Sequence, residues 1–142
     1  DFQIEVVVGQ GVDGSRCLRF FGDKVKNAWN YVGVGKLTQT VPWGSYRLSM
    51  KMKVMAYPDD VRGTPHPKLA IHDLEDKWLS NQNGTPYDMR RKGEWQELSV
   101  VLHLEDDERF LGSAIETGAY GTVIKGVEIL LDDIRLELIS EP

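Results

Sequence analysis

Residues 46–56 alternate between apolar and polar side chains, and this alternation constrains the fold more than any other feature. Apolar residues hold the even positions, namely Tyr46, Leu48, Met50, Met52, Val54 and Ala56. Polar residues hold most of the odd positions, namely Arg47, Ser49, Lys51 and Lys53. Successive side chains of a β-strand point to opposite faces of its sheet. A period of two therefore predicts a long, half-buried strand with Tyr46 in the core.

Two further segments show the same period. One has apolar residues at Leu98, Val100, Leu102 and Leu104. The other lies near the C-terminus and has them at Leu130, Ile134, Leu136 and Leu138. Val127, Ile129 and Leu131 have the opposite parity, and Asp132 and Asp133 interrupt the segment. We expect a bulge or a bend at the two aspartates, where the buried face of the strand would change.

Glycine and proline turns separate these segments, and no window of a dozen residues has a helical stripe. The pattern predicts an all-β fold, a two-sheet antiparallel β-sandwich of the jelly-roll kind. A length of 142 residues fits a single domain over residues 1–142. The longest loops are expected at residues 58–67 and 81–92, where turn-forming residues cluster.

Charge and composition exclude several classes of protein. A net charge of −5 argues against a nucleic-acid partner, which favours basic surfaces. No apolar stretch approaches the roughly 20 residues that cross a bilayer, so no membrane partner is expected. The first residues lack the pattern of a signal peptide. The single cysteine, Cys17, lies in an apolar run and is expected to be a buried hydrophobe.

Four segments, taken in order, resemble β-jelly-roll carbohydrate-binding modules related to families 4, 9 and 22. The segments are residues 14–20, Trp29-Asn30-Tyr31 with Leu37-Thr38-Gln39, residues 46–53, and Ile115-Glu116-Thr117 with residues 131–136. The resemblance implies a non-catalytic module that binds a polysaccharide or oligosaccharide. It also implies a secreted, extracellular or periplasmic location and a link to a catalytic domain of a polysaccharide-degrading enzyme. The alternative is a structural or interaction domain that packs against a neighbouring domain without binding a glycan.

The N-terminal segment departs from the family. The family's N-x-x-F-E pattern, and the tryptophan that follows it, are not visible in this chain. Either residues 2–8 take the place of that segment or its strand is missing. The resemblance further implies a structural calcium ion held by the early loop and the closing strand. Its predicted ligands are Asp133 with Asp13, Ser15 and Glu5, since calcium prefers several oxygen ligands. Otherwise Asp132 and Asp133 only end the strand pairing or take a hydrogen bond of the bulge.

Sugar sites combine aromatic rings with hydrogen-bonding groups, and several residues fit that description. Trp29 and Tyr31 share one face by their spacing, and Trp78 and Tyr87 lie in or beside a predicted loop. The resemblance adds Glu116 as a carboxylate that accepts sugar hydroxyls. It also places rings near positions 51 and 114 and an arginine near 23, where this chain has Lys51, Ala114 and Asp23.

The cationic strand face that includes Arg47 and Lys51 has three interpretations. It binds an acidic or branched glycan through charge-assisted hydrogen bonds, it contacts a neighbouring domain, or it is a solvated surface. An enzyme is not expected, because a glycosidase needs two carboxylates that flank the scissile bond. The acidic run Glu105–Glu108 is typical of a solvated turn. Besides a binding module and an interaction domain, the third functional alternative for the whole chain is a small jelly-roll hydrolase or lyase.

Overall fold

The computed structural model describes residues 2–22, 29–37, 43–58, 63–73, 75, 77–104, 114–122 and 125–140. Within these ranges, only the backbone is described for residues 2–3, 29–37, 114, 116 and 122. Strands dominate the described residues, and the helical turns are the short 3-10 segments η1 (Val12–Gly14) and η2 (Met89–Arg91). None of the described helices is long and apolar enough to cross a membrane.

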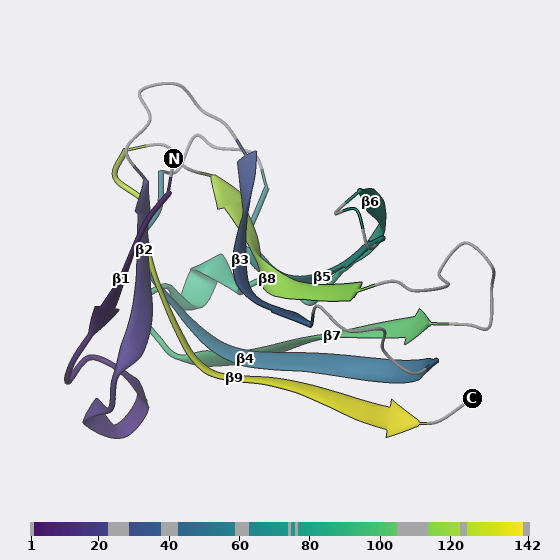
Figure 1. The fold of residues 1–142 in the computed structure, drawn as a ribbon. Coiled ribbons are helices and arrows are strands. Elements are labelled where there is room, and N and C mark those ends of the chain that lie inside the picture. Colours follow the sequence, from purple (N-terminus) through teal and green to yellow (C-terminus); the bar gives the residue numbers. More distant parts are fainter. Residues whose placement is uncertain are drawn as a thin grey trace.

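The strands form two antiparallel sheets that face each other (Figure 1). The five-stranded sheet has the order β1-β2-β9-β4-β7, and the four-stranded sheet has the order β3-β8-β5-β6. The strands of the first sheet are β1 (Phe2–Val7), β2 (Cys17–Gly22), β9 (Glu128–Ser140), β4 (Gly44–Ala56) and β7 (Gln96–Leu104). Those of the second are β3 (Trp29–Leu37), β8 (Ala114–Thr122), β5 (His66–His72) and β6 (Trp78–Asn83). The predicted β-sandwich is confirmed.

The core lies between the sheets and is built from the alternating positions. In β4, Leu48, Met50, Met52 and Val54 are completely buried, and Tyr46 is 4% exposed. The apolar positions of β7 pack against the same cluster, as do Leu69 and Ile71 of β5 and Ile115 of β8. Burying a large apolar side chain contributes about 1.5–3 kcal/mol. The alternation in β4 and β7 thus decides which face of the five-stranded sheet is inside.

The expected change of buried face occurs in β9. Ile129 and Leu131 are buried in the core, and beyond the two aspartates Ile134 and Leu136 pack against it. The pairing with β4 shifts between Ser49 and Lys51, and Asp133 has a φ of 49°. The predicted bulge is confirmed at the predicted residues.

The N-terminal segment forms β1, which pairs with β2 at the edge of the five-stranded sheet. Residues 2–7 therefore provide a strand at this edge. Cys17, at the start of β2, is 4% exposed and has no disulfide, as expected of a buried hydrophobe. Burial and the charge of Asp132 raise the pKa of its thiol.

The two predicted loops are shorter than expected. His66 and Pro67 belong to β5, and residues 81–83 belong to β6. Between β6 and β7, the chain folds around Tyr87, which is 2% exposed. Its hydroxyl donates toward the carbonyls of Glu94 (2.7 Å) and Arg91 (3.0 Å), so the ring anchors this connection. The expectation of an exposed sugar-binding Tyr87 is wrong.

Candidate functional site

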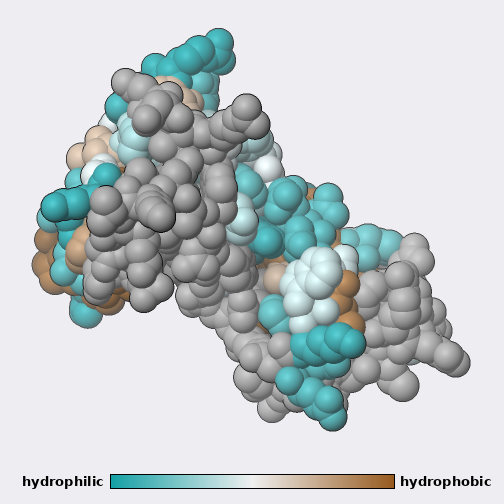
Figure 2. All heavy atoms as spheres, turned by 90° about the horizontal axis from the view of Figure 1, so that it is seen from above, coloured by the Kyte–Doolittle hydropathy of each residue, from teal (hydrophilic) through white to brown (hydrophobic). Residues whose placement is uncertain are grey.

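The outer face of the four-stranded sheet is the first candidate binding surface. Figure 1 shows β3 and β6 rising on either side of β8 and β5, so the sheet presents a concave surface away from the core. Leu69 and Ile71 of β5 are in the core, so His66, Lys68 and His72 lie on the opposite side of the strand. Seen from above, hydrophilic side chains predominate among the described atoms of this face (Figure 2).

Tyr120 of β8 contacts two neighbours on this face. The His66 ring stacks on it with 5.7 Å between ring centroids, and Lys68 Nζ lies 4.5 Å from the Tyr120 centroid. The cation is attracted to the electron-rich ring face. Burial lowers the pKa of Lys68, because desolvation disfavours the charged amine.

A cavity of about 370 Å³ adjoins this cluster and is lined by Gly63, Thr64, His66, Pro86 and Tyr120. His66 Nδ1 lies 2.8 Å from the carbonyl oxygen of Thr64 and donates a hydrogen bond to it. The other ring nitrogen, Nε2, is buried and finds no hydrogen-bond partner within the described structure. Buried polar atoms without a partner are uncommon, so this nitrogen distinguishes His66 from the other residues that line the cavity.

The edge strand β6 adds an exposed ring and two amides to this face. Trp78 is 55% exposed and pairs in register with His72. Asn81 Nδ2 lies 3.5 Å from Asn83 Oδ1, and Asn83 pairs with Lys68. Aromatic faces contact the C–H surfaces of a sugar, while amides donate to and accept from its hydroxyls. The described part of the face therefore has the chemistry of a sugar site.

Three further predicted site residues belong to the same sheet. Tyr31 pairs with Tyr120, Trp29 pairs with Thr122, and Glu116 pairs with Lys36 on one side and Ala70 on the other. These are backbone positions, and the side chains of Trp29, Tyr31 and Glu116 lie outside the described residues. Their roles in binding remain predictions.

Arg47 and Lys51 do not join this surface. They belong to β4, in the five-stranded sheet, and line a separate groove on its outer face. The sequence indicated that both face away from the core, but it did not indicate which other strands would lie beside them. A single binding site that includes Lys51 and Glu116 is therefore wrong, because the two residues belong to different sheets.

The four predicted calcium ligands do not come together. Asp133 Oδ2 pairs with Lys51 Nζ at 3.4 Å, and Glu5 pairs with Arg19 at 2.8 Å. Asp13 is exposed in η1, and the described residues contain no group of three metal-binding side chains. The predicted ligand set thus does not fit a calcium site.

The aspartate that reaches the early loop is Asp132. Its Oδ2 accepts hydrogen bonds from Val12 N (2.8 Å) and Ser15 Oγ (3.0 Å). Its Oδ1 accepts one from Asp133 N at 2.8 Å. Hydrogen-bond donors occupy both carboxylate oxygens, so Asp132 links β9 directly to the loop between β1 and β2. We call this arrangement the Asp132 clasp.

Sequence signals for a site role of His66, Lys68, Asn81 and Tyr120 were weak. His66 precedes a proline in a stretch that resembles a loop, and Tyr120 stands between small residues without an apolar alternation. Lys68 and His72 do alternate with Leu69 and Ile71, and that period was the available signal for β5. Bringing these strands side by side required the tertiary structure.

No protein-family model and no curated protein sequence matches the chain. Solved structures match its fold. The CBM22-1 and GH10 modules of Clostridium thermocellum xylanase 10B, complexed with xylohexaose, give a TM-score of 0.60 at 15% identity, over 98% of this chain and 25% of that chain. The CBM22-1 xylan-binding domain of Paenibacillus barcinonensis Xyn10C gives 0.60 at 16% identity, over 99% and 83% of the two chains.

A cyclase from Fischerella sp. has a similar fold, with a TM-score of 0.57 at 13% identity over 91% of this chain and 66% of the cyclase. These matches establish a β-sandwich like that of carbohydrate-binding modules. The chain spans a quarter of the first of these proteins. Because a binding module and a cyclase share the fold, function must be argued from the surface of this chain.

Proposed function

We propose that this chain is a non-catalytic glycan-binding module whose binding surface is the outer face of the four-stranded sheet. One observation carries the proposal, which is the Tyr120 ring held by His66 and Lys68 beside a cavity on a concave face. A ring fixed by its neighbours loses little conformational freedom when it binds. Such a ring is suited to contact a sugar that enters the adjoining cavity.

Polar groups around the ring supply the second half of sugar recognition. The amides of Asn81 and Asn83 offer donors and acceptors for hydroxyls. The exposed Trp78 extends the aromatic surface toward one end of the sheet. Contacts of this kind add about 0.5–1.5 kcal/mol per ring, so we expect dissociation constants in the micromolar to millimolar range.

The solved relatives support a more specific version of the proposal. One was crystallised with xylohexaose, and another is described as a xylan-binding domain. We propose a β-linked plant polysaccharide such as xylan as the ligand class, with the chain attached to a catalytic domain of a secreted enzyme. The described side chains of this face carry rings, amides and cations rather than two carboxylates. This composition supports binding over glycoside hydrolysis.

Titration with xylohexaose tests the proposal, with Trp78→Ala and Asn81→Ala as variants. We expect each to weaken binding about two- to tenfold, because each removes one sugar contact. Val101→Ala is the matched control, since Val101 is 45% exposed on the other sheet. Tyr31→Ala and Glu116→Ala test the two predicted residues whose side chains are outside the described structure.

The proposal fails if neither xylohexaose nor a panel of soluble polysaccharides binds, or if Val101→Ala weakens binding as much as Trp78→Ala.

One observation favours the alternative of an interaction domain. Ile4, Val6 and Val8 are 53%, 61% and 79% exposed, and hydrophobic atoms gather where β1 and β2 lie (Figure 2). Exposed apolar patches often mark contacts with a partner. Ile4→Ser with Val6→Ser would then abolish partner binding and spare glycan binding.

A further inference from the structure

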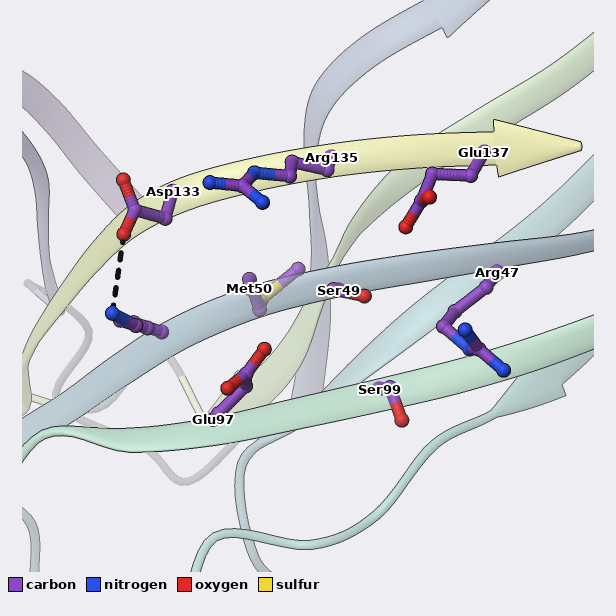
Figure 3. A pocket seen from close by; sticks show the side chains of 9 residues that line it. Arg47, Ser49, Met50, Glu97, Ser99, Asp133, Arg135 and Glu137 are labelled. Atoms are coloured by element: carbon purple, nitrogen blue, oxygen red, sulfur yellow. Dashed lines mark ion pairs between the residues drawn. The ribbon is translucent and has the colours of Figure 1, made fainter. Parts of the chain in front are cut away.

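The outer face of the five-stranded sheet carries a polar groove that the proposed function does not use. Three adjacent strands, β9, β4 and β7, contribute its side chains, and its volume is about 450 Å³ (Figure 3). Small-molecule sites have volumes of roughly 300–1,000 Å³. The groove lies on the opposite side of the core from Tyr120, so it is a separate surface.

Charges of both signs alternate along this polar groove. Lys51 Nζ and Asp133 Oδ2 form an ion pair of 3.4 Å at one end, and Arg47 pairs in register with Glu137 at the other (Figure 3). Arg135 lies between these ends on β9. Within the described residues, no ion pair or hydrogen bond of the Arg135 or Arg47 guanidinium is present. Each end of the groove therefore has a cation opposite an acid, whereas Arg135 at the centre has no anionic partner among the described residues.

Two hydroxyls accompany Arg135 at the centre of the groove. In the sheet register, Arg135 lies opposite Ser49, and Ser49 lies opposite Ser99. Short side chains at these two positions leave space over the middle strand, while Glu97 stands beside Lys51 on the neighbouring strand. The centre thus offers a planar cation and two small donors or acceptors, with carboxylates at the margins.

The bulge in β9 produces this arrangement. It turns Asp132 toward the early loop, and it places Asp133, Arg135 and Glu137 on the same outer face. Without the extra residue, the positions beyond 132 would have the opposite parity, and Arg135 would point to the core. The same irregularity therefore builds the Asp132 clasp and aligns the groove.

We infer that the polar groove binds a carboxylate-bearing sugar, such as a uronic acid unit of an acidic glycan. The Arg135 guanidinium donates two parallel hydrogen bonds to the sugar carboxylate, a geometry that suits this pair of groups. Ser49 and Ser99 bond the adjacent ring oxygens and hydroxyls, and Glu97 and Glu137 accept from hydroxyls further along. This site goes beyond the proposed function and does not depend on it.

The charges in the groove favour a carboxylate over a denser anion. Three cations line it, but so do three acids, Glu97, Asp133 and Glu137. A phosphate or sulfate carries its charge on three or more oxygens and would approach the acids on either side of Arg135. A sugar carboxylate has one charge and many hydroxyls, so it matches one cation surrounded by acceptors.

Isothermal titration with trigalacturonate at low ionic strength tests this inference, with fully methyl-esterified trigalacturonate as the uncharged probe. We expect the acid to bind and the ester to bind at least about tenfold more weakly, because the ester cannot accept a charge-assisted bidentate bond. Arg135→Gln should weaken binding of the acid by a similar factor, and Arg135→Lys should restore part of it. Added salt should weaken the acid's binding only.

Arg91→Gln is the matched control, because Arg91 is an exposed arginine outside the groove. Thermal unfolding of Arg135→Gln confirms that the variant is folded. The inference is overturned if trigalacturonate does not bind, if the ester binds equally well, or if Arg91→Gln weakens binding as much as Arg135→Gln. Trp78→Ala should leave trigalacturonate binding unchanged, so the two surfaces can succeed or fail separately.

Discussion

At the scale of single residues, the loop between β1 and β2 depends on atoms packed closely around Gly11. Its amide donates to the carbonyl of Ser15 at 2.8 Å. A Cβ at Gly11 would lie 2.7 Å from the Arg16 carbonyl oxygen, from Asp132 Oδ2 and from Ser15 Oγ. One of these contacts is with backbone, which cannot rotate away. Glycine is therefore required by the close approach of the Asp132 clasp.

The first prediction is that Gly11→Ala lowers the free energy of unfolding by about 1–3 kcal/mol, the usual cost of overpacking. Gly121→Ala is the control, since a Cβ there would meet its nearest atoms at 3.8 Å. Urea unfolding of both variants measures the difference. Equal stability of the two variants would show that the loop rearranges around the methyl group.

The second prediction separates the two adjacent aspartates. Asp132→Asn puts an amide donor in place of one acceptor oxygen and removes the negative charge that strengthens three hydrogen bonds. We therefore expect the free energy of unfolding to fall by about 1.5–3 kcal/mol. Asp133→Asn removes a half-exposed ion pair and should cost less than about 1 kcal/mol. Asparagine tolerates the φ of 49° at position 133, so Asp133→Asn adds no backbone strain. The reverse order of effects would contradict the assignment of the clasp.

The four named ligands do not come together, but calcium binding by the chain remains a prediction and has its own measurement. An ion that binds only the folded chain raises the midpoint of thermal unfolding, so EDTA would lower the midpoint and added calcium would restore it. An unchanged midpoint would contradict the calcium prediction. The result does not depend on the glycan, because the unfolding is measured without ligand.

At the scale of elements, the connection between β6 and β7 is anchored from inside. Besides Tyr87, Gln96 bonds the backbone of Asp88 in both directions, with Oε1 accepting from Asp88 N and Nε2 donating to Asp88 O. Asp88 caps η2 by accepting from Arg90 N, and the Arg90 side chain holds the pKa of Asp88 below its usual range. The connection is therefore a packed unit, although its composition resembles a flexible loop.

The third prediction is that Tyr87→Phe costs about 1–2 kcal/mol of stability and leaves sugar affinity unchanged. The variant keeps the buried ring but leaves the Arg91 and Glu94 carbonyls without this donor. Trp78→Ala should show the opposite profile, with weaker binding and nearly unchanged stability, because Trp78 is exposed. Unfolding and titration of both variants check the pair, and a binding defect in Tyr87→Phe would restore Tyr87 to the sugar site.

At the scale of the whole molecule, one thiol reports on the packing of the sandwich. Cys17 is buried at the start of β2, and its raised pKa keeps it protonated at neutral pH. The fourth prediction is that DTNB labels the native protein slowly, because the reactive thiolate forms only after opening. The labelling rate should rise with denaturant. Fast labelling without denaturant would show that β2 opens locally.

The raised thiol pKa also has a consequence for stability. Because the folded pKa exceeds the unfolded one, the contribution to stability is fully present below the unfolded pKa and is lost as pH rises through the folded pKa. The fifth prediction is that Cys17→Ala flattens the alkaline part of the stability profile. Urea unfolding from neutral to alkaline pH measures this, and parallel profiles of the two proteins would contradict it.

The sequence by itself determined the elements with a clear period. The alternations in residues 46–56 and 98–104 predicted β4 and β7, and the parity change at Asp132 and Asp133 predicted the bulge in β9. They were predictable because burial of one face leaves a local pattern in a strand. Such patterns identify the buried face of each strand. They do not identify which strands become neighbours.

Neighbour relations were decided only by the tertiary structure. Sheet order placed Lys51 and Glu116 in different sheets, brought Tyr120 into contact with His66 and Lys68, and brought Arg135 beside Ser49 and Ser99. It also selected Asp132 over Asp133 for the early loop. These contacts join residues far apart in the chain, and their formation depends on packing of the whole core. A period of two cannot encode them, because it describes one strand at a time.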